Sequence, residues 1–386
     1  MKSTSRMFAY LAPLCGACLL GTVLTARQAP PQETPLMAEE FFEDVRVLKG
    51  IPVDEFLDTM GMFAAATGLN CTDCHVDESG GSWPAYADDT QLKTTSRAMV
   101  GIMAAINKQF FNGREGVTCY SCHTGTRKPK AIPNLALQYA ADPILVAPFE
   151  ILEPTPGAPA TDEVLDRYIA AVGGAARLGE LTSIIAEGRY AGYDDFEDYP
   201  VEVFAKAPNQ RTTILHSQYG DITTTFDGRS GWLASPIETK PAPVIVMSGG
   251  NLQGLAIEAQ LSFPGQIKQA LTDWIPGPLN VIDDREVRII QGRDPSGTPV
   301  KLYFDEESGL LVRLVRYSSN SPVGRVPTQV DFEDYRDVSG IQFPFKVTST
   351  WTNGRYVYQF ANVQINPTIP AARFARPVPP PWPAAP

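Results

Sequence analysis

The sequence predicts an α+β protein of two domains. A small, mostly helical domain at residues 41–130 precedes an antiparallel curved-sheet or half-barrel domain with covering helices at residues 161–366. In the first domain, apolar residues recur at helical spacing in two segments. Residues 161–181 are expected to form one helix, with Thr161 as its cap. Short strand-like runs then follow one another between polar turns at 183–235 and 285–365, with a partly helical stretch at 253–274 between them. Seven prolines between residues 127 and 160 separate the two patterns, and we take 131–160 as a proline-rich linker.

The first 26 residues are typical of an export signal. Lys2 and Arg6 precede a stretch without charge at 7–25, and the small Ala26 offers a cleavage point. Because that stretch nearly has the length of a membrane span, an uncleaved N-terminal anchor is the alternative. Residues 27–40 would then form a linker. Either way we expect the protein in the periplasm or on the outer face of a bacterial membrane.

Net charge and composition limit the classes of molecule that the protein could bind. The formal net charge of −11 argues against nucleic acid, because phosphate binding needs a clustered positive field. The hydrophobic fraction of 44% is enough for a buried core. The last segment, 367–386, contains eight prolines and is predicted to be disordered.

Two pentads carry the chemistry of the chain. "CTDCH" stands at 71–75 and "CYSCH" at 119–123 within "VTCYSCHTG", and they contain every cysteine beyond the export signal. C-x-x-C-H is the attachment pattern of c-type haem, in which each thiol adds to a porphyrin vinyl group and the histidine binds the iron. We therefore expect two covalently attached haem c groups, bound by the residues Cys71, Cys74, His75, Cys119, Cys122 and His123.

Three other interpretations compete with haem. A Cys₂His₂ zinc site would need histidines three to five residues apart, and the three histidines are not so spaced. A C-x-x-C redox pair does not need a histidine directly after it, nor a second copy. Four cysteines in an exported protein would also suit disulfides, but that reading leaves both histidines unexplained.

The sixth iron ligand is predicted to be methionine. A distal histidine for each haem is excluded because only His216 remains, and its place on a predicted strand indicates a structural role. Met60 lies on the apolar stripe of the predicted helix "PVDEFLDTMGMFAAATG", eleven residues before Cys71. The helix "TSRAMVGIMAAINKQFF" has both Met99 and Met103 on its stripe, and spacing does not decide between them. Methionine on an apolar stripe is also common core packing.

Both pentads and the helices before them resemble a known family. "VRVLKGIPVDEFLDTMGMFAAATGLNCTDCHV" and "SRAMVGIMAAINKQFFNGREGVTCYSCHTG" are similar to the cytochrome c subunit of photosynthetic reaction centres, over residues 41–130, and most similar to its shorter two-haem relatives. The resemblance implies a distal methionine on the helix before each pentad. These are Met60 and, from its distance to Asn107, Met99, which leaves Met103 to packing. The photosynthetic members carry four haems and this chain has two pentads, so no role in photosynthesis is implied.

The second half resembles the periplasmic lipoprotein-carrier fold, a half barrel wrapped on helices. The resemblance rests on "YIAAVGG", "YPVEVFAKAPN", "FDGRSGW" and "YFDEESGLLVRL". It implies a concave sheet that binds an apolar acyl chain, with no catalytic residues. An ordinary filled core is the alternative, because fold does not fix function.

These observations predict an exported electron carrier rather than an enzyme, working by outer-sphere transfer with redox partner proteins that are soluble or membrane-bound. One alternative is a haem enzyme or sensor with one open coordination site for peroxide or a gas. Another is a periplasmic binder of an apolar small ligand in the β-domain, with an attached redox domain.

Overall fold

The computed structural model describes residues 32–132, 150–193, 197–236, 241–320 and 323–379. The expected export signal or anchor at 1–26 and most of the proline-rich linker lie outside these residues. In the described part of the chain, no helix has both the length and the apolar character needed to cross a membrane.

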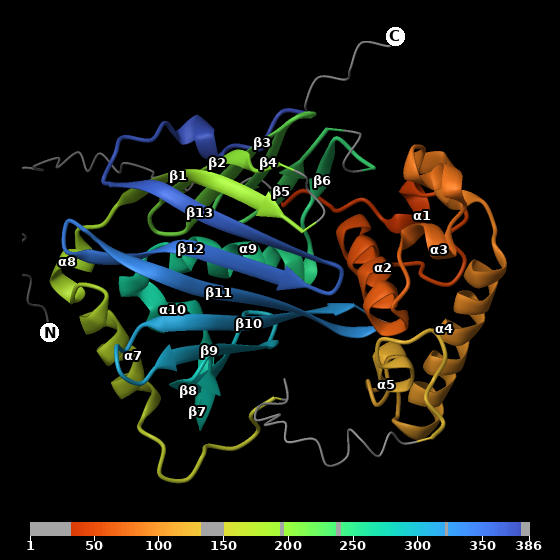
Figure 1. The fold of residues 1–386 in the computed structure, drawn as a ribbon, viewed down its shortest axis with the longest axis horizontal. Helices are drawn as coiled ribbons and strands as arrows, with labels where there is room; N and C mark the ends of the chain where they lie inside the picture. The colour runs from red at the N-terminus through yellow and green to blue at the C-terminus, as the bar shows by residue number, and fades with distance from the viewer. Residues whose placement is uncertain (1–31, 133–149, 194–196, 237–240, 321–322, 380–386) are drawn as a thin grey trace, which may run out of the picture. The chain divides into compact units, whose positions relative to one another are not determined.

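The helical region comes first in the chain, as predicted (Figure 1). Two long helices dominate it, and each is followed by a short helix that begins at the first cysteine of a pentad. Its elements are α1 (Ala38–Phe41), α2 (Val53–Thr67), α3 (Cys71–Cys74), the 3₁₀ helices η1 (Asp77–Gly80) and η2 (Trp83–Ala87), α4 (Gln91–Phe110) and α5 (Cys119–His123).

The rest is a large curved antiparallel sheet with helices, which confirms the predicted fold class (Figure 1). Its thirteen strands run in the order β6-β5-β4-β3-β2-β1-β13-β12-β11-β10-β9-β8-β7. The strands are β1 (Ser183–Gly192), β2 (Tyr199–Lys206), β3 (Gln210–Ser217), β4 (Gly220–Phe226), β5 (Gly231–Ala234), β6 (Val244–Val246), β7 (Thr272–Ile282), β8 (Arg285–Arg293), β9 (Pro299–Asp305), β10 (Leu311–Asn320), β11 (Gly324–Val338), β12 (Ile341–Trp351) and β13 (Gly354–Ile365). The helical elements among them are α7 (Thr161–Ala171), α8 (Ala175–Gly179), α9 (Gly249–Leu261), η3 (Pro264–Gln266), α10 (Ile267–Ala270) and η4 (Ala371–Phe374).

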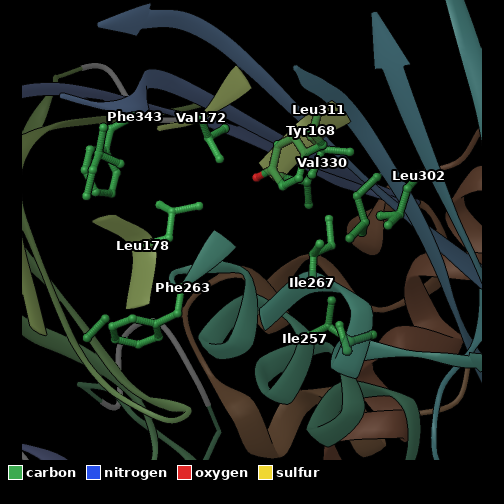
Figure 2. Close-up of a cluster of buried hydrophobic side chains, with 14 of the residues drawn as sticks. Tyr168, Val172, Leu178, Ile257, Phe263, Ile267, Leu302, Leu311, Val330 and Phe343 are labelled. Carbon is green, nitrogen blue, oxygen red and sulfur yellow. The ribbon is translucent and has the colours of Figure 1, made fainter. Parts of the chain in front are cut away.

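The main core lies between one face of the sheet and helices α7, α9 and α10. Tyr168 of α7, Ile257 of α9 and Ile267 of α10 point into it (Figure 2). Strand residues such as Leu302 and Val330 pack against them, and all five side chains are buried. These helices therefore cover one face of the sheet and bury its side chains. Two hollows in the described part of the chain are lined by apolar side chains together with charged ones such as Arg167 and Glu333.

Helix α2 also packs on the sheet region. Asp54, in its first turn, is buried and accepts hydrogen bonds from Ser248, through the backbone N–H at 2.7 Å and Oγ at 2.6 Å. Met62 packs with Val323 and Val326 at the β10–β11 hairpin. These contacts hold one face of α2 against the sheet region.

Four segments differ from what the sequence predicts. Residues 161–181, expected to be one helix, form α7 and α8 with a break at Gly173 and Gly174, which both have positive φ. Strands β6 and β7 were not expected. The start of the proline-rich tail is packed rather than disordered, because Ile369 and Phe374 are buried against Phe204.

The described end of the linker is also attached to the sheet. Gln291 accepts a hydrogen bond from the backbone N–H of Ile151 at 2.7 Å and donates to its carbonyl at 3.0 Å. The N–H of Thr155 donates to the carbonyl of Pro276. Residues 150–160 therefore lie along the sheet instead of forming a free connection.

Candidate functional site

The first pentad is built at the end of α2. Gly68 closes that helix in the left-handed conformation, with φ of 68°. Asn70 then caps α3: its Oδ1 accepts from the backbone N–H of Asp73 at 2.9 Å, and the Asp73 carboxylate accepts from the N–H of Asn70 at 2.8 Å. In the resulting helical turn, Cys71 and Cys74 are three residues apart and so lie on the same side.

The second pentad is positioned from α4. The Asn107 side chain donates to the carbonyl of Val117 at 2.8 Å and accepts from the N–H groups of Gly116 and Val117. Thr118 and Ser121 then form the cap of α5. Asn107 thus ties the entrance of the second pentad to the helix before it, a role that its place in the sequence did not reveal.

Both pentad histidines are oriented through one ring nitrogen. Nδ1 of His75 lies 3.2 Å from the carbonyl oxygen of Tyr86, and Nδ1 of His123 lies 3.1 Å from that of Thr126. An Nδ1–H bonded to a backbone carbonyl leaves Nε2 as a lone-pair donor, which is the usual arrangement of a metal-bound histidine. Burial and then Lys93 lower the pKa of His75, which favours the neutral form that binds a metal.

The four cysteines in the described part of the chain are free thiols. Cys71 and Cys122 are exposed, while burial raises the pKa of the half-buried Cys74 and Cys119. None of them is in a disulfide, and the described residues contain no cluster of three or more histidine, cysteine or acidic side chains suited to a metal ion.

The four nearby methionines have different surroundings. Met60 is half-buried beside Leu48, Ile51 and Val100, whereas Met62 is buried on the opposite side of α2. On α4, Met103 is only 6% exposed, and its Sδ lies 3.8 Å from Sγ of Cys119. Met99 is 41% exposed.

Met99 is one of several exposed large side chains in this region. Four other large side chains of α4, its C-terminal cap and α5 are also exposed: Ile102, Phe110, Phe111 and Tyr120. Exposed apolar side chains near the second pentad suit an apolar macrocycle attached there. Together with the free thiols and the oriented imidazoles, they fit a haem c group.

The two pentad units touch each other. The backbone N–H of Gly125, two residues after His123, donates to the carbonyl of Ala66 in α2 at 2.9 Å. A methyl group on Gly68 would lie 2.6 Å from the carbonyl oxygen of Gly125, so the close approach requires glycine there. Groups attached at the two pentads would therefore be neighbours.

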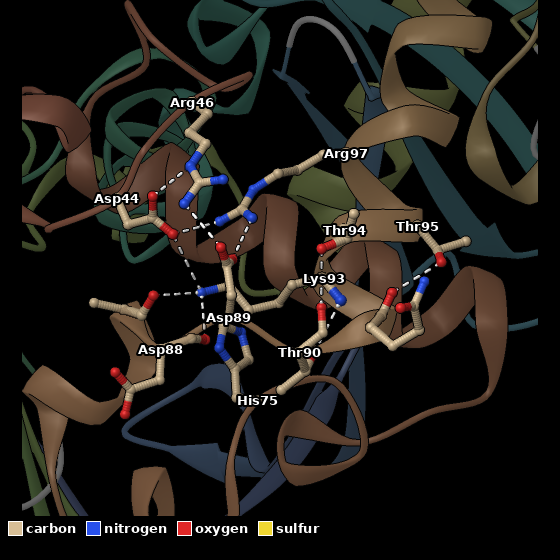
Figure 3. A network of polar contacts seen from close by, with 12 residues as sticks. Asp44, Arg46, His75, Asp88, Asp89, Thr90, Lys93, Thr94, Thr95 and Arg97 are labelled. Carbon is tan, nitrogen blue, oxygen red and sulfur yellow. Dashed lines mark hydrogen bonds and ion pairs between the residues drawn. The ribbon is translucent and has the colours of Figure 1, made fainter.

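A charged network surrounds the first pentad on the side of α4 (Figure 3). Asp44 pairs with Arg97 at 2.6 Å and with Arg46, and Asp89 pairs with both arginines. Lys93 is 11% exposed and lies 3.7 Å from Asp44. Neither Lys93 nor Tyr86 stood out in the sequence, because their positions near His75 depend on the loop at 76–90.

His216 lies on β3 and has partners at both ring nitrogens. Asp221 is 2.7 Å from Nδ1, and Glu202 is 3.1 Å from Nε2. Although burial opposes charge here, these hydrogen bonds raise the pKa of His216 above its usual value. Its engaged ring nitrogens agree with the structural role that the sequence suggested.

Comparison with known proteins separates the two halves. Residues 20–140 match the model of the family "Photosynthetic reaction centre cytochrome C subunit". The photosynthetic reaction center cytochrome c subunit of Thermochromatium tepidum is 37% identical over 99 residues, which cover 24% of this chain and 23% of that protein. That of Rubrivivax gelatinosus is 31% identical over 122 residues, 28% of this chain and 31% of that protein. The matches thus span less than a third of either relative.

Solved structures match the other half. A LolA superfamily protein from Nitrosomonas europaea has a TM-score of 0.38 at 13% identity, with 56% of this chain and 98% of that chain covered. A putative outer membrane lipoprotein-sorting protein domain from Vibrio parahaemolyticus has a TM-score of 0.37 at 10% identity, with 55% and 94% covered. In its N-terminal third, where both pentads lie, the chain resembles the cytochrome c subunit of photosynthetic reaction centres, as its motifs predicted.

Proposed function

We propose that the protein is an exported di-haem c-type cytochrome that transfers electrons by an outer-sphere mechanism. The observation that carries this proposal is the repeated local geometry. Each pentad sits on a capped helical turn, and each histidine engages a backbone carbonyl through Nδ1 and leaves Nε2 available. A single such unit would suit one haem, and two suit a pair.

The chain's own residues would have distinct tasks. The thiols of Cys71 and Cys74 bind one haem covalently, and those of Cys119 and Cys122 bind the other. His75 and His123 are the proximal iron ligands. The bound haems supply a reversible Fe(III)/Fe(II) couple.

Met60 and Met99 are the distal ligands in this proposal. The environment of α4 supports Met99 over Met103, because the Met99 side chain is exposed while Met103 is buried against Cys119. Met60 is supported by its half-buried place in the apolar cluster of the first unit. Two methionine ligands would leave no open iron site, which argues against the enzyme or sensor alternative.

The remaining parts of the proposal concern location and partners. The signal-like pattern at 1–26 supports a location in the periplasm or at the outer face of the membrane. Its partners are redox proteins, soluble or membrane-bound. The sheet region serves docking or support rather than transport of an apolar ligand, because α7, α9 and α10 fill its main core.

Expression with a cytochrome c maturation system would test the proposal. We expect two haems per chain by the pyridine haemochrome assay and a methionine–iron charge-transfer band in the far red of the oxidised spectrum. The reduced protein should not bind carbon monoxide. Carbon monoxide binding by half of the haem would instead indicate one open site, and with it the enzyme or sensor function.

A further inference from the structure

The backbone carbonyl of Tyr86, which orients His75, accepts a second hydrogen bond. Tyr86 O lies 3.2 Å from Nδ1 of His75, and it also accepts a hydrogen bond from Nζ of Lys93 at 3.0 Å. The Tyr86 ring packs edge-on against the His75 ring, with centroids 4.7 Å apart. One backbone group therefore joins the imidazole to a lysine of α4.

The hydrogen bonds of Lys93 are those of an ammonium ion. Nζ donates to three carbonyls, those of Tyr86, Ala87 and Asp88, at 3.0, 2.9 and 2.8 Å. Three donors in use correspond to the three N–H bonds of a charged amine. Asp44, 3.7 Å away, supplies a counter-charge.

The surrounding network leaves the cations in excess. Its members are three cations, Arg46, Lys93 and Arg97, and two carboxylates, Asp44 and Asp89 (Figure 3). The formal sum is +1, while the whole chain carries −11. Because Lys93 is mostly shielded from water, its charge is screened less than that of a surface lysine.

The second histidine lacks this arrangement. Thr126 O lies 3.1 Å from Nδ1 of His123, and in the described part of the chain no cation donates to that carbonyl. The Thr126 side chain instead donates to the carbonyls of His123 and Lys128. The two histidines thus have similar first partners and different second ones.

We infer that Lys93 is a positioning residue that raises the reduction potential of the haem at His75 above the value the pentad alone would give. The inference rests on the proposed function, since it requires haem at that histidine. A nearby positive charge favours Fe(II), which carries less charge than Fe(III). A carbonyl already bonded to an ammonium is also a weaker acceptor for Nδ1–H, so the imidazole donates less electron density to the iron.

Spectroelectrochemical titration of the two-haem protein would test the inference. In Lys93→Met we expect one Nernst component to shift negative, by about a threefold to tenfold change in its reduction equilibrium, where tenfold equals about 59 mV for one electron. Asp44→Asn, which removes the counter-charge, should shift the same component positive. Lys108→Met, an exposed lysine of the same helix, is the matched control and should leave that component unchanged.

Opposite shifts of one component would support the inference, because general loosening of the loop cannot move a potential in both directions. Equal shifts of both components, or none in either variant, would overturn it. If Lys93→Met fails to assemble with haem, the positive shift in Asp44→Asn decides. A wild-type chain without two haems would instead overturn the proposed function, so the two failures are distinguishable.

Discussion

Helices α2 and α4 precede the two pentads in the same way, yet their surroundings differ. Six of the fifteen residues of α2 are buried, against two of the twenty in α4. One face of α2 packs on the helical cluster around Leu48 and Val100, and the other packs on the sheet region. Helix α4 instead has three large apolar side chains exposed, those of Met99, Ile102 and Phe110. The first pentad thus follows a helix, α2, that is packed on two faces. The second follows a helix, α4, whose exposed side chains a bound cofactor would cover.

The largest expected effect separates the two methionines of α4. Met99→Ala should open the iron site of the second haem, so that half of the reduced haem binds carbon monoxide. Because Met99 is already 41% exposed, its loss should cost little stability in the chain without haem. Met103→Ala should leave both haems closed and lower the free energy of unfolding by about 2 kcal/mol or more. Carbon monoxide difference spectra and urea titrations check both outcomes, and carbon monoxide binding by Met103→Ala alone would reverse the assignment.

The attachment of α2 to the sheet region is open to a direct test. Asp54→Ala would remove the acceptor for both the backbone N–H and the hydroxyl of Ser248, which are buried with it. We expect a loss of about 3 kcal/mol in the free energy of unfolding, since hydrogen bonds to a buried charge are among the costly ones to break. Asp88→Ala, at an exposed carboxylate before α4, should change it by less than about 0.5 kcal/mol. Equal losses of unfolding free energy in the two variants would mean that Asp54 does not fix α2 to the sheet region.

What the sequence could predict follows from how local each feature is. The pentads, the helices before them and most strands depend on residue types at fixed spacing, and these expectations agree with the structure. The second buried face of α2 could not be predicted from local spacing. Burial of Met62 requires the β10–β11 hairpin, which is more than 250 residues further along the chain. Strand β7 escaped prediction because Pro276 and Pro278 argue against a strand, and an edge position with two register breaks is where they are tolerated. The role of Lys93 could not be predicted either, because the carbonyl groups that it binds lie in an irregular loop.

The ends of the two helices offer a matched pair of glycines. Gly68 and Gly113 have φ of 68° and 76°, but a methyl group on Gly68 would meet the Gly125 carbonyl, while one on Gly113 meets nothing within 4 Å. We expect Gly113→Ala to cost about 1 kcal/mol for the left-handed conformation alone. Gly68→Ala should cost about 2 kcal/mol more, because the pentad units must also separate. Urea unfolding followed by far-ultraviolet circular dichroism gives both values, and equal costs would mean that the contact between the units contributes little.

The smallest expected effect is a change of stability with pH. It arises from Glu55 in α2 and has no counterpart in α4, which contains no acidic residue. Burial, and then Asp54 and Asp58, raise the pKa of Glu55 to about 7 from its usual 4.5. Between these values the folded chain binds a proton that the unfolded chain has lost, so this group's contribution to stability falls as pH rises from 4.5 to 7 and is level above.

Glu55→Gln should remove that slope, because the amide is neutral throughout, and leave the variant more stable than the wild type at pH 8. The two proteins should converge near pH 4.5, while Glu43→Gln at an exposed position should follow the wild type. Urea midpoints measured from pH 4.5 to 8 would show the difference. If Glu55→Gln and the wild type showed the same dependence of stability on pH, the Glu55 carboxylate would be ionised in the folded chain. The packing of α2 on the sheet region would then not depend on protonation of Glu55.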